Sequence, residues 1–465
     1  MRARRVAVLV LSVVAAMLVA GCSDNGSDSG AGTENPVRGD WHGKIDVPGQ
    51  PLEIGVNFES ADSATIDIPS QGAEDVQLKD VTAEPDRVEF TIPDIPGDPK
   101  FHGTYDAGAS QITGEFTQSG QTFKLVMQPG TIAPAARPQE PKPPFPYESE
   151  DVSYTNGDIT IAGTLTTPEG DGPFPAVVML TGSGPQDRNE ELFGHKPFLL
   201  ISDTLTRAGY AVLRTDDRGV GGTSGKLEDA TYDDLAGDAV AGMDYLRTRA
   251  DIDPARIGLF GHSEGGYLAP LVATKPGSDP AFAILMAGPS VPGGDVLIEQ
   301  NRALFEANGA SPEETDAQVA YITDLTTAMR AGDLDGAREV ARTHNQTLPE
   351  DQRMTDEQID GLLTPSMTSF MTYDPAPALS ALQVPVLAFF GGKDLQVLPS
   401  QNEQPMRDLL ADNPDATVHT FPELNHLMQP AGTGSPSEYS TIETTVSPEV
   451  LDFVKAWLTQ RVPTK

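Results

Sequence analysis

The chain has 465 residues, a formal net charge of -37 and a hydrophobic content of 38%. This length is too great for one compact core, so we expect two or more domains, and the apolar content excludes global disorder. So large a negative charge repels phosphate backbones and anionic membrane surfaces, which argues against nucleic acid as a partner. A solvated, soluble surface is the simplest interpretation of the charge, and a salt-adapted or cation-binding surface is the alternative.

The first residues have the pattern of a bacterial lipoprotein signal peptide. Three arginines precede an apolar run at residues 6–20, which is too short for a comfortable membrane span. The run ends in VAGC at residues 19–22, which resembles the bacterial lipobox, and this resemblance implies a diacylglyceryl group on Cys22. An ordinary secretory signal is the alternative. Cys22 is the only cysteine of the chain, so it cannot belong to an internal disulfide.

The lipobox sets the expected location of the protein. We expect residues 1–21 to be removed and the remaining chain to lie outside the cytoplasm, held at the cell membrane by the lipid on Cys22. Residues 22–37 are rich in Ser, Gly, Asp and Asn, a composition typical of a flexible tether. The membrane is therefore an expected partner through the anchor.

Residues 38–130 have the pattern of a small antiparallel β-domain. Apolar side chains alternate with polar or small ones in three runs, at residues 54–58, 88–92 and 123–127. Alternation with a period of two gives each strand one buried face, and clusters of Gly, Pro, Asp and Asn separate the runs as turns require. We predict a barrel or sandwich. Because it contains no obvious cluster of reactive side chains, we expect a structural or binding accessory.

A linker and a change of pattern follow. Residues 131–147 are crowded with proline, which favours an extended, semi-rigid spacer. From residue 148 to residue 465 strands and helices alternate, which predicts a doubly wound, mostly parallel α/β sheet. Five apolar runs predict buried parallel strands, at residues 176–180, 211–213, 257–260, 282–286 and 386–390.

A segment from about residue 291 to residue 373 interrupts this alternation. Ser311, a proline after it and Glu314 form the pattern of a capped helix start, and apolar residues then recur at helical spacing. Thr355 and Gln358 predict a second capping box. An all-helical insertion between two strands predicts a cap over the active site, and a helical excursion packed elsewhere is the alternative.

Residues 261–265, with the sequence GHSEG, fit the nucleophile-elbow pattern Gly-x-Ser-x-Gly. The turn is so tight that side chains two residues before and after the serine would collide, which explains both glycines. A buried strand pattern precedes the motif and a helical pattern follows it, as an elbow requires. One feature conflicts, because Pro270 should kink that helix. The pattern predicts Ser263 as a nucleophile.

A serine hydroxyl is a weak nucleophile until a base takes its proton. Of the seven histidines, His426 is the best candidate, since it lies in a loop just after a short strand pattern at residues 417–421. The order in α/β-hydrolases is serine, acid, histidine, so the acid should precede His426. Asp394 directly follows a predicted strand and can hold the imidazole tautomer and stabilise the imidazolium. The alternative for Asp394 is a surface turn.

The tetrahedral oxyanion needs two backbone donors. One should be the N–H of Glu264, the residue after the predicted nucleophile. The other should come from the glycine-rich loop after the strand at residues 176–180. We assign the N–H of Ser183, with Gly184 as the second choice, and an ordinary glycine-rich turn is the alternative for this loop.

Five segments in order resemble the α/β-hydrolase superfamily over roughly residues 148–465. They are residues 180–188, 216–221, 261–266, 390–397 and 425–427. More narrowly, the chain looks like bacterial lipoprotein esterases with a β-domain before the hydrolase domain. Residues 39–43 and 67–72 resemble that accessory domain less specifically.

The resemblance implies carboxylesterase activity with the matching triad Ser263, Asp394 and His426. Related sequences are often described as serine aminopeptidases or thioesterases. One departure is Thr181, which stands where many members carry a His-Gly pair. That change keeps the backbone donor in place.

We therefore expect acyl transfer to water on a small or medium ester, through an acyl-enzyme at Ser263. We expect neither a metal nor an organic cofactor, since no His/Cys/Asp cluster has ligand spacing. An envelope peptidase on short peptides is one alternative, and it would need a pocket carboxylate such as Glu299 or Glu306 to hold the substrate amine. A surface binding protein without activity is another, and an intact triad argues against it.

Overall fold

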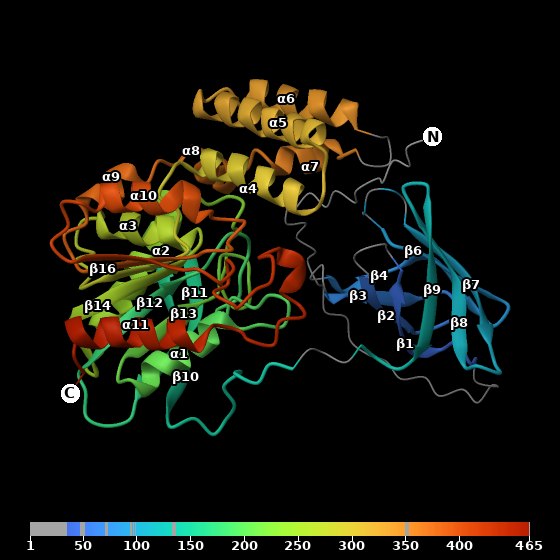
Figure 1. Cartoon of the computed structure of the whole chain (residues 1–465). Coiled ribbons are helices and arrows are strands. Elements are labelled where there is room, and N and C mark those ends of the chain that lie inside the picture. The colour runs from blue at the N-terminus through green and yellow to red at the C-terminus, as the bar shows by residue number, and fades with distance from the viewer. Residues whose placement is uncertain are drawn as a thin grey trace.

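The computed structural model describes residues 35–464 apart from residues 47–51, 70–72, 94, 96, 98, 133–135 and 349–352. The predicted signal peptide, Cys22 and nearly all of the predicted tether lie outside the described residues. Two β-sheets organise the described chain, one of nine strands and one of eight (Figure 1). Within the described residues, no helix combines the length and the apolar character that crossing a membrane requires.

The first sheet is antiparallel throughout and comes before the α/β unit, as the alternating pattern predicts. Its spatial order is β4-β3-β2-β1-β9-β8-β7-β6-β5. The strands are β1 (Gly39–Ile45), β2 (Leu52–Phe58), β3 (Ala64–Ile68), β4 (Ala73–Gln77), β5 (Lys79–Glu84), β6 (Arg87–Thr91), β7 (Lys100–Asp106), β8 (Gln111–Gln118) and β9 (Gln121–Pro129). One face buries a separate core that includes Trp41, Phe58 and Phe90. The indole N–H of Trp41 donates to the carbonyl of Val37 at 2.7 Å.

The second sheet is mostly parallel, as predicted. Its order is β10-β11-β13-β12-β14-β15-β16-β17, and only the pairs β10–β11 and β11–β13 are antiparallel. The strands are β10 (Tyr147–Asn156), β11 (Ile159–Pro168), β12 (Phe174–Leu180), β13 (Ala211–Thr215), β14 (Ile252–His262), β15 (Ala283–Met286), β16 (Val386–Gly391) and β17 (Ala416–Phe421). Central strands are apolar along their whole length because both faces are covered.

Helices cover both faces of this sheet and create two hydrophobic cores (Figure 1). One group comprises α1 (Pro197–Arg207) and α11 (Pro448–Arg461), and the other comprises α2 (Tyr232–Arg247), α3 (Gly265–Ala273), α9 (Ala376–Ala381) and α10 (Pro399–Leu409). Neighbouring residues of β12 lie in different cores. Val177 packs with the helices of the first group and Val178 with those of the second. The sheet is therefore doubly wound.

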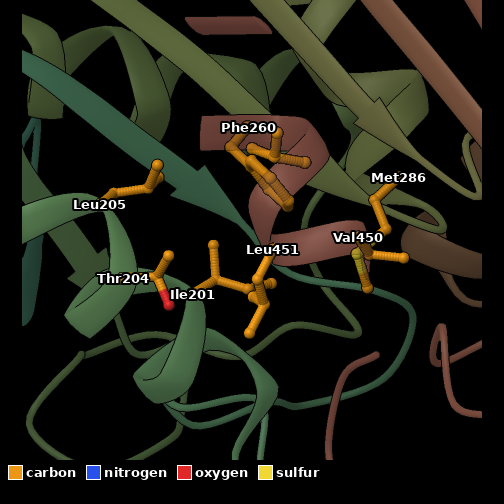
Figure 2. Close-up of a pocket in the computed structure, with 8 residues that line it drawn as sticks. Ile201, Thr204, Leu205, Phe260, Met286, Val450 and Leu451 are labelled. Carbon is orange, nitrogen blue, oxygen red and sulfur yellow. The ribbon is translucent and has the colours of Figure 1, made fainter. Parts of the chain in front are cut away.

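A small cavity lies between the sheet and the helices α1 and α11 (Figure 2). Ile201 and Leu205 of α1, Phe260 of β14 and Val450 of α11 contribute to its apolar wall. Its one polar side chain, Thr204, donates its hydroxyl hydrogen bond to a carbonyl within its own helix. We interpret it as a gap in core packing, because its walls offer no group that could bind a polar substrate.

The helical insertion predicted between two strands is present, and it has a small core of its own. Its helices are α4 (Gly293–Ala307), α5 (Pro312–Arg330), α6 (Leu334–Thr347), α7 (Asp356–Gly361) and α8 (Pro365–Thr372). Both predicted capping boxes form, at Ser311 and Thr355. Phe370 and Tyr373 pack against Tyr267 of α3, so the insertion meets the helix that begins just after the predicted elbow. A cap over the active site stays a prediction.

The proline-rich segment is attached to the α/β unit. The guanidinium of Arg137 donates to the carbonyls of Phe193, Ser440 and Ile442 at 2.7–3.0 Å. Gln139 accepts from the N–H of Thr445 at 2.7 Å. This part of the linker makes a turn, in which the N–H of Glu140 donates to the carbonyl of Arg137 at 3.0 Å, and its side chains attach it to the second sheet's unit.

Candidate active site

The predicted elbow forms at the end of β14. Ser263 has a φ of +53°, a left-handed conformation that is strained for a residue with a side chain. Its N–H donates to the carbonyl of Met286 at 2.9 Å, and α3 begins two residues later. A Cβ at Gly261 would lie 2.0 Å from the carbonyl oxygen of Gly265. The steric argument for the motif therefore holds, and Pro270 is accommodated inside α3.

Asp394 and His426 form a buried hydrogen-bonded pair. Asp394 follows β16 and His426 follows β17, and the two residues are 2% and 4% exposed. The Asp394 Oδ2 atom lies 2.8 Å from His426 Nδ1. The other carboxylate oxygen accepts the N–H groups of Gln396 and Val397 at 2.7 and 2.9 Å. Because Nδ1–H is donated to the carboxylate, Nε2 is left to accept a proton.

The loops after β14 and β17 bring Ser263 and His426 to the same edge of the sheet. The ring of His262, directly before Ser263, has its centroid 4.9 Å from that of His426. The hydrogen bonds among the described residues do not include one from Ser263 Oγ to His426 Nε2. Such bonds are often long before substrate binds, so this geometry fits a resting enzyme.

The loop after β12 packs against the predicted nucleophile. A Cβ at Gly182 would lie 3.4 Å from the Cβ of Ser263. The N–H of Gly182 is occupied, since it donates to Glu190 Oε1 at 2.7 Å. Within the described part of the chain, the N–H groups of Ser183, Gly184 and Glu264 donate to no acceptor. All three predicted oxyanion donors therefore remain available.

Two carboxyl groups beside the elbow were given no role from the sequence, which singled out Glu264 for its backbone N–H alone and did not name Asp217 as a site residue, although both lie in the segments that resemble α/β-hydrolases. Burial raises the pKa of Glu264 to about 7, and Glu264 accepts a hydrogen bond from the hydroxyl of Tyr232 at 2.7 Å. Burial raises the pKa of Asp217 to about 8, although hydrogen bonds from the N–H of Gln186 and the hydroxyl of Thr181 act to lower it. Near neutral pH both groups therefore exist in protonated and ionised forms.

Glu264→Gln is expected to change how stability depends on pH. The pKa of Glu264 rises from an ordinary 4.5 to about 7 on folding, so the folded protein binds this proton more tightly than the unfolded chain. That stabilisation is complete below about pH 4.5 and is lost as the pH rises to about 7. Because Glu264 is partly exposed, we expect a change of about 2 kcal/mol.

Thermal unfolding between pH 4 and pH 8 measures this effect. As the pH rises from 4 to 8, the Tm of Glu264→Gln should increase by several degrees relative to the Tm of wild type. Glu169→Gln, at an exposed turn, is the matched control and should run parallel to wild type. Parallel curves for Glu264→Gln would contradict the expected pKa.

Three further side chains, those of His195, Glu299 and Glu306, are paired or exposed. His195 is buried and hydrogen-bonds Thr445 and the carbonyl of Tyr439. On α4, the carboxylate of Glu299 lies 3.6 Å from the guanidinium of Arg302, and Glu306 is exposed. Among the described residues, no group of three or more His, Cys, Asp or Glu could hold a metal ion.

Comparison with known proteins identifies the family. The model of the alpha/beta hydrolase family matches residues 177–434. The chain belongs to this family. The matched residues begin in β12 and run past the loop after β17, so they include Ser263, Asp394 and His426.

The chain is also similar to individual known proteins. The chain is 27% identical to the esterase EstD of Thermotoga maritima over 310 residues, which are 66% of this chain and 68% of EstD. An esterase of Pyrococcus furiosus is 16% identical, with a TM-score of 0.44 over 70% of this chain and 98% of that chain. A proline iminopeptidase of Mycobacterium smegmatis is 18% identical, with a TM-score of 0.43 over 67% and 98%. Family membership and the similarity to EstD show that the protein is a hydrolase.

Proposed function

We propose that this hydrolase is a serine carboxylesterase acting on small or medium acyl esters through an acyl-enzyme at Ser263. The observation that carries the proposal is the strained Ser263 next to the buried Asp394–His426 pair, at one edge of the parallel sheet. An activated serine, a base and an acid that orients the base are the parts that nucleophilic acyl transfer needs. The esterase relative supports an ester as the substrate.

In the proposed reaction, Ser263 Oγ attacks the ester carbonyl carbon while His426 Nε2 takes its proton. The carbonyl oxygen becomes an oxyanion, which accepts hydrogen bonds from the N–H groups of Glu264 and Ser183. Asp394 stabilises the imidazolium. The C–O bond to the alcohol then breaks, and His426 returns its proton to the departing oxygen. Water attacks the acyl-enzyme by the same steps and releases the acid.

Cleavage of short peptides is the second candidate. One observation favours it: the carboxyl group of Glu264 lies directly after the nucleophile and is partly ionised near neutral pH, so it could bind the free amine of a substrate. Thioester cleavage would use the same acyl-enzyme. We also propose that the enzyme acts outside the cytoplasm, anchored through Cys22, as the VAGC sequence at residues 19–22 indicates.

A labelling experiment tests the nucleophile first. Protein beginning at Ser23 is treated with a fluorophosphonate probe, and mass spectrometry locates the label; Ser263→Ala is run beside it. We expect labelling of wild type at Ser263 and none of the variant. Absence of labelling in folded wild type would overturn the serine-hydrolase proposal.

Substrate class needs a second measurement. Turnover of p-nitrophenyl esters of increasing acyl length should be highest for short or medium chains. Labelling without ester turnover, together with release of amino acids from short peptides, would replace the esterase assignment by the peptidase one. A panel of acyl thioesters distinguishes the third substrate class.

A further inference from the structure

We propose that Glu190 and His262 act together as positioning residues. They fix the loop after β12, called here the oxyanion loop because it carries Ser183, relative to the loop after β17, called the base loop because it carries His426. The inference rests on the proposed function, because it assigns a role in the same acyl transfer. Neither residue is expected to touch the substrate. The pair instead connects three loops, those after β12, β14 and β17, that carry the proposed reacting groups.

The backbone around Glu190 is built to direct this side chain inward. Glu190 has a left-handed φ of +53° although it is not glycine, and it is only 2% exposed. Its N–H donates to the carbonyl of Asp187 at 2.8 Å. The carboxylate of Asp187 accepts the N–H groups of Asn189 and Glu191, which closes the turn on both sides. A strained, tightly held turn of this kind commonly serves a functional site.

The carboxylate of Glu190 joins the oxyanion loop to the elbow. Its Oε1 atom accepts the N–H of Gly182 at 2.7 Å and lies 2.8 Å from His262 Nδ1. Holding the Gly182 N–H fixes the Thr181–Gly182 peptide, which directly precedes the peptide that carries the Ser183 N–H, a proposed oxyanion donor. Within the described residues, the other oxygen of Glu190 is buried without a hydrogen-bond partner. Such an oxygen is costly unless the negative charge is compensated nearby.

His262 supplies that compensation and extends the link to the base. Its Nε2 lies 3.3 Å from the carbonyl oxygen of His426, and the residue is 3% exposed. Because a carboxylate and a carbonyl only accept hydrogen bonds, both ring nitrogens can donate only when the ring is protonated. Burial alone would lower the pKa of His262, but the charge and hydrogen bond of Glu190 outweigh it and raise the pKa.

Other charged groups act on the pair formed by Glu190 and His262. Asp394 also favours the protonated form of His262, and His426 faces it ring to ring. The charge of Glu190 also contributes to the raised pKa of Asp217. In the pair, the positive charge of a protonated His262 compensates the negative charge of Glu190. Losing its charges would release Gly182 on one side and the His426 carbonyl on the other.

Glu190→Gln tests the pair, because it keeps the shape of the side chain and removes its charge. We expect kcat on the best p-nitrophenyl ester to fall about 10- to 100-fold, since small misplacements of reacting groups cost this much. KM should stay within about twofold, because the substrate is not contacted. His262→Gln should lower kcat to a similar extent. In the double variant kcat should fall by no more than the larger of the two single losses, as for residues that act as one unit.

Glu89→Gln is the matched control. Glu89 Oε1 lies 2.6 Å from His102 Nδ1 on the surface of the first sheet, so this change weakens the same kind of contact outside the active site. Its kcat should equal that of wild type. Imidazole nitrogen NMR of the resting enzyme gives a readout that a merely structural role would not move. The pKa of His262 measured in this way should lie above its ordinary value in wild type and fall in Glu190→Gln.

Wild-type kcat in folded Glu190→Gln would overturn the inference, as would independent losses that multiply in the double variant. If Glu190→Gln does not fold, the NMR titration of wild type decides, because a His262 pKa below its ordinary value also overturns the inference. Failure of the proposed function gives a different result: wild type is then neither labelled by the fluorophosphonate nor active on esters.

Discussion

His426→Ala is expected to lower kcat on p-nitrophenyl esters by about a million-fold, the loss typical of removing the base from such a triad. Without the imidazole, Ser263 Oγ has no group in position to take its proton. His426 is buried and held by Asp394, so the change removes the base and leaves the backbone donors near Ser183 and Glu264 intact. A small residual rate should remain, since oxyanion stabilisation acts without the triad.

Steady-state kinetics and the rate of fluorophosphonate labelling measure this loss. His419→Ala is the matched control, since His419 lies on β17, seven residues before His426, and packs against Phe421 and Phe453. It should retain most of the wild-type kcat. A loss of less than tenfold in His426→Ala would show that another group acts as the base.

Asp394→Asn is expected to lower kcat by about ten-thousand-fold while the fold is kept. The reason is the direction of the hydrogen bonds. The N–H groups of Gln396 and Val397 both point at Asp394 Oδ1, so an asparagine would place its oxygen there. Its NH2 group would then face His426 Nδ1 and require that nitrogen to accept. The proton would move to Nε2, which could no longer take the proton of Ser263.

The same kinetic assay, with circular dichroism to check folding, tests this expectation. Asp412→Asn removes a carboxylate from an exposed turn and should leave kcat unchanged. Nitrogen NMR should show the His426 proton on Nδ1 in wild type and on Nε2 in Asp394→Asn. A wild-type tautomer in the variant would contradict the argument from hydrogen-bond direction.

Local patterns predicted much of the fold because the forces behind them act over a few residues. The two capping boxes at Ser311 and Thr355 were predicted since each needs only a side chain and the backbone three residues on. The strands of the second sheet were predicted because strands buried on both faces read as apolar runs. Gly261 and Ser263 were recognised by the sterics of one turn.

Such local patterns could not predict the strand order of the first sheet or the attachment of the linker. Alternation predicted strands that bury one face, but the strand order of the nine-stranded sheet depends on pairing between distant segments. The proline-rich composition predicted an extended spacer. The contacts of Arg137 with Phe193 and Ser440 depend on how those residues are presented by the folded α/β unit.

The sequence by itself determined which side chains could act: the serine of the elbow, a histidine after the last strand and an aspartate after the strand before it. Only the tertiary structure decided which of them meet. Asp394 and His426 are 32 residues apart, and Glu190 and His262 are 72 apart, and each pair is joined because parallel strands end at one edge of the sheet. The raised pKa of Glu264 has the same origin, since burial by distant segments cannot be read from neighbouring residues.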